Sequence, residues 1–405
     1  MFKRSFILTA ILTLSTSIFS VTHAQQKDSK LFMVSGYIQT DALFGEKDAN
    51  HSVGELYTHD EINKTGKSFS RFGIRRGRIK GTFAKKDWSI IAQLNITENR
   101  VAPHTMMLQW SPDKWKGFDI RIGLQEDGFG LESSLSGKDL LGVERSQYIT
   151  DLFRGNIDVC VSINYKPKNL SHLNNTGFRL GLMSGNNGGK MRKNKPDILL
   201  RLTTGHLYEN KDQWEIGLSG YYGDVAQNNG IGSVDRQYIG SHFKLGKASA
   251  WGLTSLYGEC ITGKQPGQFF NNTVTGPAIK ASDYFNPSYV IFSRKFLGAM
   301  GVLTHRFDKM PVELIGKYYY YDRNLDLSAN EIAEHFKNNE KTFSPHNENA
   351  NHVWGAGATY IGMKNALRIT AYYEWMRHEL IPNKQSRYSS KLNDNLMTIR
   401  LQYSF

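Results

Sequence analysis

The feature that most constrains the fold is an alternation of apolar and polar side chains, with a period of two, that recurs in short segments to the end of the chain. In residues 88–97 apolar side chains stand at every even position from Trp88 to Ile96, while the odd positions are mostly polar. This is the period of a β-strand with one apolar face, because successive side chains point to opposite sides of a sheet. Such a face meets either a second sheet in a soluble sandwich or the lipid around a membrane barrel.

About sixteen segments of this kind can be placed, an even number as bacterial membrane barrels require. They lie near residues 31–43, 70–83, 88–98, 104–110, 118–126, 156–165, 177–184, 197–206, 213–223, 235–245, 249–260, 297–307, 311–322, 351–362, 366–378 and 394–405. The stretch 285–296 holds either a further half-strand or an extension of the twelfth strand.

The lengths of the connections separate the two alternatives. Short connections at 84–87, 111–117, 207–212, 246–248, 308–310 and 363–365 alternate with longer polar segments at 44–69, 128–154, 185–196, 224–234, 261–296, 323–350 and 379–393. Two connections break this alternation. Residues 166–176 form a long connection where a short turn is expected, and residues 99–103 form a short connection where a long loop is expected. Short periplasmic turns and longer external loops are typical of outer-membrane barrels. We therefore expect an all-β fold, with one transmembrane antiparallel β-barrel occupying residues 25–405, wide enough at sixteen strands for an aqueous channel.

The two ends of the chain agree with export to the bacterial outer membrane. Lys3 and Arg4 precede a short apolar run at 6–19, and small residues up to Ala24 form a cleavage site, which predicts a signal peptide over residues 1–24. The last strand alternates up to the terminal Phe405, as in the signal that outer-membrane proteins present to their insertion machinery. Aromatic residues near strand ends fit either interfacial girdles or a core; they are Trp88, Trp110, Tyr165, Trp214, Tyr360 and Trp375.

No motif in the sequence calls for catalysis. G-x-S-x-G and H-E-x-x-H do not occur, and the twelve histidines are dispersed. Cys160 and Cys260 are about a hundred residues apart, and we interpret both as strand residues rather than as a disulfide. We expect no enzyme activity, no cofactor and no metal site. The chain is basic, with a net charge of +13, but the export signal argues against nucleic acid as its partner.

The function is then expected on the inward faces of the strands. In the second strand Ile79 and Phe83 face lipid, which turns Arg76, Arg78 and Lys80 inward. These three cations are spaced by two residues of strand rise, about 6.6–6.8 Å.

A bulge is expected in the same strand. Phe72 and Ile74 have the opposite parity to Ile79, so the register shifts around Arg75 or Arg76.

The same alternation assigns the remaining wall residues. Further inward cations are Arg121, Arg179, Arg201, Lys244, Lys317, Arg368 and Arg400, and the inward acids are Asp119, Asp158, Glu215, Glu313 and Glu374. Rings of Arg and Lys favour anions in a pore. Alternatively, these cations balance neighbouring acids across strands, or bind anionic lipid headgroups at the rims.

The connection after the fifth strand is the third loop, which folds into the lumen in many porins. The segments RRGRIKG (75–81), KDW (86–88), RIGLQ (121–125), FGLE (129–132) and ERS (144–146) together resemble the phosphate- and polyphosphate-selective porins of bacterial outer membranes, the porin O and P family. These segments fall within residues 70–146, and the rest of the chain matches only in its barrel pattern. The resemblance implies a sixteen-stranded homotrimer with an inward-folded third loop and a basic lumen that passes small anions such as phosphate.

On that basis the expected lumen anion-binding residues are Arg76, Arg78, Lys80, Arg121 and Arg145. Arg145 alternatively pairs with Glu144 or Asp139 and only holds the loop.

One element departs from the family pattern. After the segment that matches RIGLQ, members of the family have a basic residue and a proline. In this chain Gln125 is instead followed by Glu126 and Asp127. Two acids there lower the attraction for phosphate. We therefore expect an anion-preferring diffusion porin and leave phosphate open as its solute. The alternatives are a weakly selective general porin, or a binding or adhesion protein that uses its long external loops, one of which holds a helix-like segment at 328–337.

Overall fold

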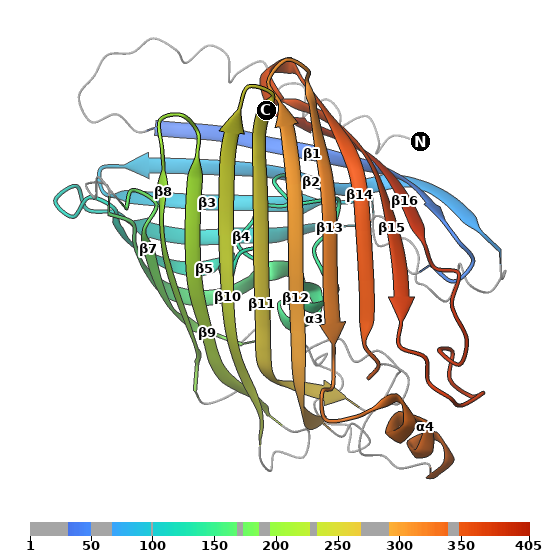
Figure 1. Ribbon diagram of the computed structural model, residues 1–405. Helices are drawn as coiled ribbons and strands as arrows, with labels where there is room; N and C mark the ends of the chain where they lie inside the picture. Colours follow the sequence, from blue (N-terminus) through green and yellow to red (C-terminus); the bar gives the residue numbers. More distant parts are fainter. Residues whose placement is uncertain are drawn as a thin grey trace, which may run out of the picture.

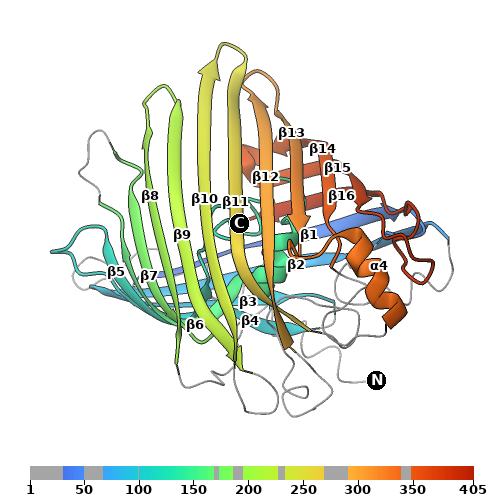
Figure 2. The same ribbon diagram turned by 60° about the horizontal axis from the view of Figure 1, so that its bottom comes forward.

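The computed structural model describes residues 31–49, 67–98, 100–167, 173–185, 195–226, 233–268, 291–338 and 348–405. Within these ranges sixteen strands form one closed barrel, in which neighbours along the sequence pair antiparallel and β1 pairs with β16 (Figures 1 and 2). The predicted sixteen-stranded barrel is confirmed. The predicted signal peptide, residues 1–24, lies outside the described residues.

The strands agree with the predicted segments to within a few residues at most ends. β1 to β8 are Leu31–Gly45, Phe69–Lys85, Trp88–Ile96, Val101–Trp110, Phe118–Glu126, Ile157–Tyr165, Gly177–Met183 and Asp197–Leu207. β9 to β16 are Gln213–Ala226, Ser233–Ser249, Gly252–Gln268, Ile291–Phe307, Val312–Asp322, Asn351–Gly362, Leu367–His378 and Leu396–Ser404. β12 begins at Ile291, so the described part of the uncertain stretch, residues 291–296, belongs to the twelfth strand.

Four short helices complete the described chain. They are α3 (Gln147–Leu152), η1 (Arg154–Asn156), α4 (Ala329–Asn338) and η3 (Met363–Asn365). α4 matches the helix predicted at 328–337 and lies at the end of the barrel with the long loops (Figure 1). None of the helices in the described ranges is long and apolar enough to cross a membrane.

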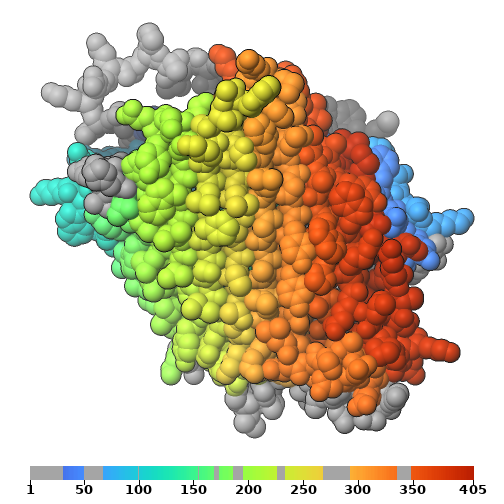
Figure 3. Space-filling view, viewed as in Figure 1, coloured from blue at the N-terminus to red at the C-terminus, as the bar shows by residue number. Residues whose placement is uncertain are grey.

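The apolar and polar side chains that alternate in the sequence form the outer and inner faces of the barrel wall. Large apolar side chains such as Phe72, Ile90 and Leu218 are exposed on the outside, and Figure 3 shows this outer surface running unbroken from the green strands to the red ones. At the short-turn end Trp88 and Trp110 lie 6.2 Å apart between ring centroids, and Trp115 continues the aromatic patch at 5.9 Å from Trp110. This placement fits an interfacial girdle.

The predicted bulge in β2 is present. Arg76 pairs with Gln39 of β1, but the next pair toward the long loops is Ile74 with Thr40, so Arg75 is the extra residue. A bulge of one residue restores the outward direction of Ile74 and Phe72, and it leaves two consecutive arginines free to turn toward the lumen.

The interior is divided into an apolar half and a polar half. Residues of the loop after β5 and of α3 pack against the inner faces of β9 to β15; this core includes Phe129, Leu131, Val143, Tyr148, Ile149, Leu152 and Phe153 from the loop side and Tyr221, Tyr238, Ile261, Phe296, Met300, Tyr319, Tyr321 and Tyr372 from the wall. α3 lies inside the barrel in both views (Figures 1 and 2). Cys160, Met183 and Leu199 of β6 to β8 belong to the same core, whereas the inner faces of β2 to β5 carry mainly polar side chains.

Candidate pore constriction

The constriction loop, residues 127–146, crosses the lumen. Near its start the Gly130 amide donates to Ser219 Oγ of β9 at 3.0 Å. Further along, Gln39 Nε2 of β1 donates to the Gly137 carbonyl at 2.9 Å. These contacts lie on well-separated strands of the barrel, so the third loop is folded inward, as predicted.

Glu144 holds the loop to the wall through three arginines. Its carboxylate accepts hydrogen bonds from Arg75 Nε at 2.8 Å, Arg76 Nη2 at 2.7 Å and Arg400 Nη2 at 2.7 Å. Arg400 also pairs with Asp41 of β1 at 2.7 Å. Charge-assisted bonds of this kind are among the strongest in proteins, and here they join one loop residue to β2 and β16.

Glu132 makes a second attachment, to β13, three strands from β16 around the barrel. Lys317 of β13 forms an ion pair with its carboxylate, and the Ser146 amide donates to it at 2.9 Å. Lys317 Nζ also donates to the Glu144 carbonyl at 3.1 Å. Lys317 therefore holds Glu132 and Glu144 together, and three cations that alternation assigns to the open lumen, Arg76, Lys317 and Arg400, pair with acids of the constriction loop.

Arg76 and Arg78 have different roles although both face inward. Arg76 is committed to Glu144. Arg78 forms no ion pair with any described residue; its Nε–H has no partner there, and its guanidinium lies 5.9 Å from the ring centroid of Tyr37. Lys80 continues the same inward face, opposite Ser35 and Gln93.

The other two predicted residues are also held, one by a carboxylate and one by the backbone. Arg121 Nε lies 2.7 Å from Asp119 Oδ1 on its own strand. Arg145 donates to the carbonyls of Glu132 and Leu135, and so holds the loop through its main chain rather than through Glu144 or Asp139. Its positive charge stays uncompensated by these contacts.

Inward cations form a basic wall from β2 to β8, which we define as Arg78, Lys80, Arg121, Arg179 and Arg201. Arg179 Nη2 donates to the Glu126 carbonyl at 2.7 Å, and Arg201 Nη1 donates to Ser134 Oγ at 2.8 Å. Both contacts are to neutral groups of the chain entering or crossing the lumen. The basic wall therefore faces the polar side of the constriction loop.

His104 was missed by the sequence analysis. It is the extra residue of a bulge in β4, because Gln93 pairs with Thr105 and Leu94 pairs with Pro103. The bulge changes the parity at this point, so a simple alternation gives His104 no defined side. Its ring is buried, with Nδ1 3.3 Å from Thr105 Oγ1.

The two acids that depart from the family pattern are not equivalent. Asp127 is buried beside Asp158, Arg179 and Arg236, and burial, reinforced by Asp158, raises the pKa of its carboxyl to about 7. Its Oδ2 atom has no partner in the described part of the chain. Glu126 is only half-buried, so it is the acid that remains near the pore surface.

The remaining reactive side chains do not assemble into a second site. Nowhere in the described ranges are three or more His, Cys, Asp or Glu side chains grouped as a metal ion would need. Both cysteines are free and belong to strands, Cys160 in β6 and Cys260 in β11, as the sequence analysis expected.

The architecture is similar to solved outer-membrane channels. The outer membrane channel DcaP of Acinetobacter baumannii is 10% identical with a TM-score of 0.57, over 95% of this chain and 100% of that chain. The anion-selective porin from Comamonas acidovorans is 10% identical with a TM-score of 0.54, over 93% and 100%. OprB of Pseudomonas putida, in its high-pH structure, is 9% identical with a TM-score of 0.53, over 92% and 94%. No family model and no curated protein sequence matches the chain. At these identities the comparisons show the porin fold.

Proposed function

We propose that this chain, after removal of residues 1–24, is a passive pore of the bacterial outer membrane that prefers small anions, with inorganic phosphate among its solutes. The observation that carries the proposal is the set of uncompensated cations at the constriction. Within the described residues, Arg78, Lys80, Arg145, Arg179 and Arg201 form no ion pair with a carboxylate. Cationic residues around a narrow lumen favour anions over cations.

The inward cations fall into an anchoring group and a group that faces the permeating ions. Arg75, Arg76, Arg400 and Lys317 pair with Glu144, Glu132 and Asp41, so most of their charge is offset and their main role is to fix the constriction. The basic wall keeps its charge except at Arg121, which pairs with Asp119. A unit charge about 4 Å from an ion contributes about 1 kcal/mol in water, so each unpaired guanidinium changes the local anion-to-cation ratio several-fold.

Conductance in planar bilayers tests the proposal. We expect the refolded full chain to pass current without added ligand, and its reversal potential in asymmetric KCl to indicate anion preference. Repeating the measurement with phosphate gives the permeability of phosphate relative to chloride. Cation preference would overturn the anion assignment, and the absence of any current would overturn the pore and favour a binding or adhesion role.

A matched pair of variants tests the residues. We expect Arg78→Gln to lower the anion-to-cation permeability ratio by about three- to five-fold, as about 1 kcal/mol per charge implies. Lys247→Gln removes the same charge from the short-turn rim, where Lys247 is exposed and paired with Asp212 at 2.6 Å. An equal change in both variants would mean that net charge, and not the basic wall, sets the selectivity.

We also propose that the chain assembles as a homotrimer, which rests on the family resemblance in residues 70–146. Chemical crosslinking in mild detergent gives the oligomer size. A monomer that conducts fully would contradict this assembly while leaving the pore intact.

A further inference from the structure

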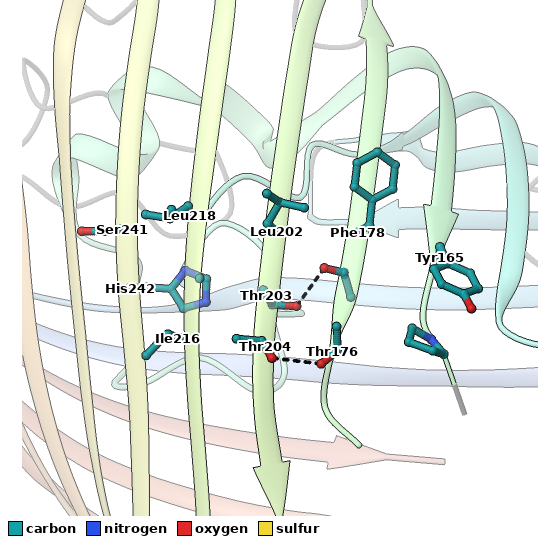
Figure 4. Close-up of a pocket in the computed structure, with 13 residues that line it drawn as sticks. Tyr165, Thr176, Phe178, Leu202, Thr203, Thr204, Ile216, Leu218, Ser241 and His242 are labelled. Atoms are coloured by element: carbon teal, nitrogen blue, oxygen red, sulfur yellow. Dashed lines mark hydrogen bonds between the residues drawn. The ribbon is translucent and has the colours of Figure 1, made fainter. Parts of the chain in front are cut away.

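An apolar groove lies on the outer wall, away from the pore. It has a volume of about 720 Å³, in the range of sites that take an organic ligand, roughly 300–1,000 Å³. Figure 4 shows Leu218, Leu202, Phe178 and Tyr165 in a row across β9, β8, β7 and β6. Leu202, Ile216 and Leu218 are 45, 51 and 59% exposed, so the groove belongs to the outer face and not to the lumen.

Toward the short-turn end the groove gains a pair of hydroxyl groups. Thr204 and Thr176 form a second row there, and their hydroxyls lie 3.0 Å apart on the outer face of β8 and just before β7 (Figure 4). Such a pair is unusual among side chains that face lipid tails, because a lipid-facing wall is otherwise apolar. The two hydroxyls are suited to hydrogen bonding with the ester and glycerol oxygens of a lipid.

A second hollow continues from the groove and carries positive charge. Its volume is about 570 Å³, and it is lined by Lys114, Trp115, Lys116, Phe118 and Tyr165. Tyr165 lines both hollows. Lys114 and Lys116 are exposed and form no ion pair with the described residues.

The short-turn end of the groove is positively charged. In the turn 111–117, two lysines and Asp113 sum to 2 − 1 = +1, and Lys166, which follows Tyr165, raises the total to +2. The Lys166 amide donates to the Gly117 carbonyl at 2.7 Å, which holds this lysine's backbone beside the turn. An apolar groove that ends in cations and interfacial aromatics is complementary to an amphiphile with an anionic head.

We propose that these two hollows together bind one anionic phospholipid of the periplasmic leaflet. Its acyl chain lies along Phe178, Leu202 and Leu218, and its phosphate lies against Lys114 and Lys116. Basic pockets at membrane surfaces are known to select anionic headgroups. The inference requires the barrel to lie in a membrane but does not depend on which ion the pore prefers.

Native mass spectrometry of the purified full chain tests this site. The protein in non-ionic detergent is mixed with equal amounts of dioleoyl phosphatidylglycerol and dioleoyl phosphatidylcholine. We expect retention of one phosphatidylglycerol in preference to phosphatidylcholine. We expect the variant Lys114→Gln/Lys116→Gln to lose this retention by about five-fold or more, as removal of two headgroup contacts implies.

Two matched controls distinguish the site from general effects. Lys309→Gln/Lys364→Gln removes the same charge from other short turns and should leave retention unchanged. Ser241→Phe fills the groove beside Leu218 and should lower retention, whereas Ala299→Phe adds the same bulk to the outer face of β12 and should not.

Three results would overturn the proposal. Equal retention of both lipids would indicate annular lipid only. Equal loss in the Lys114/Lys116 variant and its control would remove the headgroup site. Disulfide-linked dimers of Leu218→Cys in a Cys260→Ser background would show that a second copy of the chain, and not lipid, covers the groove.

Discussion

At the residue scale, the charge on Glu144 decides how many arginines are free in the lumen. We expect Glu144→Gln to release Arg75 and Arg76 into the pore, which raises the anion-to-cation permeability ratio, and to lower the thermal unfolding midpoint. Removing one partner of a largely buried ion pair costs about 3–5 kcal/mol, and the Glu144 side chain is 13% exposed. Reversal potentials and thermal melts measure the two effects.

A less buried pair provides the control for this change. Glu313 lies 3.7 Å from Arg368, and both side chains are more exposed. Glu313→Gln should therefore alter stability and selectivity less. If Glu144→Gln leaves the permeability ratio unchanged, the arginines it releases do not reach the path of the ions.

A second residue makes a prediction about pH. Folding raises the pKa of Asp127 to about 7, so its carboxyl is neutral below that pH and gains a charge above it. Between its unfolded pKa and about 7 the folded state binds the extra proton, so the stability from this group is lost as pH rises through 7. We also expect anion preference to fall on the order of two-fold from pH 6 to pH 8, because the new charge lies beside Arg179.

The variant Asp127→Asn isolates this effect. It should abolish the pH step in the permeability ratio, whereas Glu126→Gln should keep the step while raising anion preference at both pH values. A step that persists in Asp127→Asn would assign it to another titrating group.

The sequence predicts which way an inward cation points but not whether that cation is paired with an acid. Alternation correctly turned Arg76, Arg78 and Lys80 inward, because a strand's parity is a local property. It could not distinguish Arg76 from Arg78, since the acid that neutralises Arg76 lies 68 residues away in the constriction loop. Counting all ten inward cations as unpaired therefore overestimates the free positive charge of the lumen.

At the element scale, the constriction loop depends on its own apolar core as much as on its ion pairs. Phe129 is fully buried, stacks on Phe153 at 5.0 Å between centroids and meets Tyr238 at 6.4 Å. Phe129→Ala should cost about 3–5 kcal/mol. Because the cost falls on the loop and not on the strand pairing, we expect a noisier, larger single-channel conductance with an intact barrel.

Phe72→Ala is the matched control, since Phe72 is 75% exposed on the outer face. Its single-channel conductance should equal that of the unmodified chain. If Phe129→Ala also conducts normally, the loop keeps its position through Glu132 and Glu144 alone.

The elements differed in how well the sequence specified them. β14 spans Asn351–Gly362 as predicted, and the β2 bulge followed from a change of parity within one strand. β4, in contrast, begins at Val101 rather than near 104, because its bulge at His104 breaks the alternation that marks a strand start. The path of the constriction loop depends on contacts with β1, β2, β9, β13 and β16, which no local sequence pattern contains.

At the scale of the whole molecule, the barrel closes where the first strand meets the last. Gly36 and Phe405 exchange backbone hydrogen bonds, at 2.9 Å from the Gly36 amide and 3.0 Å from the Phe405 amide. The Phe405 ring also occupies the space beside Gly36, since an added Cβ there would lie 2.6 Å from Phe405 Cζ and 2.4 Å from the Arg78 carbonyl oxygen. The terminal aromatic therefore fits against a glycine of β1.

This closure predicts a selective effect of one glycine. Gly36→Val should displace both the Phe405 ring and the β1–β2 backbone contact, so fewer chains should form the closed barrel. Gly81→Val is the matched control on the next strand, because the nearest atom to its added Cβ lies 3.8 Å away, an ordinary contact. Heat-modifiable migration on gels measures the closed fraction, and equal closed fractions in the two variants would mean that the seam tolerates a side chain at Gly36. A loss confined to Gly36→Val would show that the contact between Gly36 and Phe405 takes part in closing the barrel.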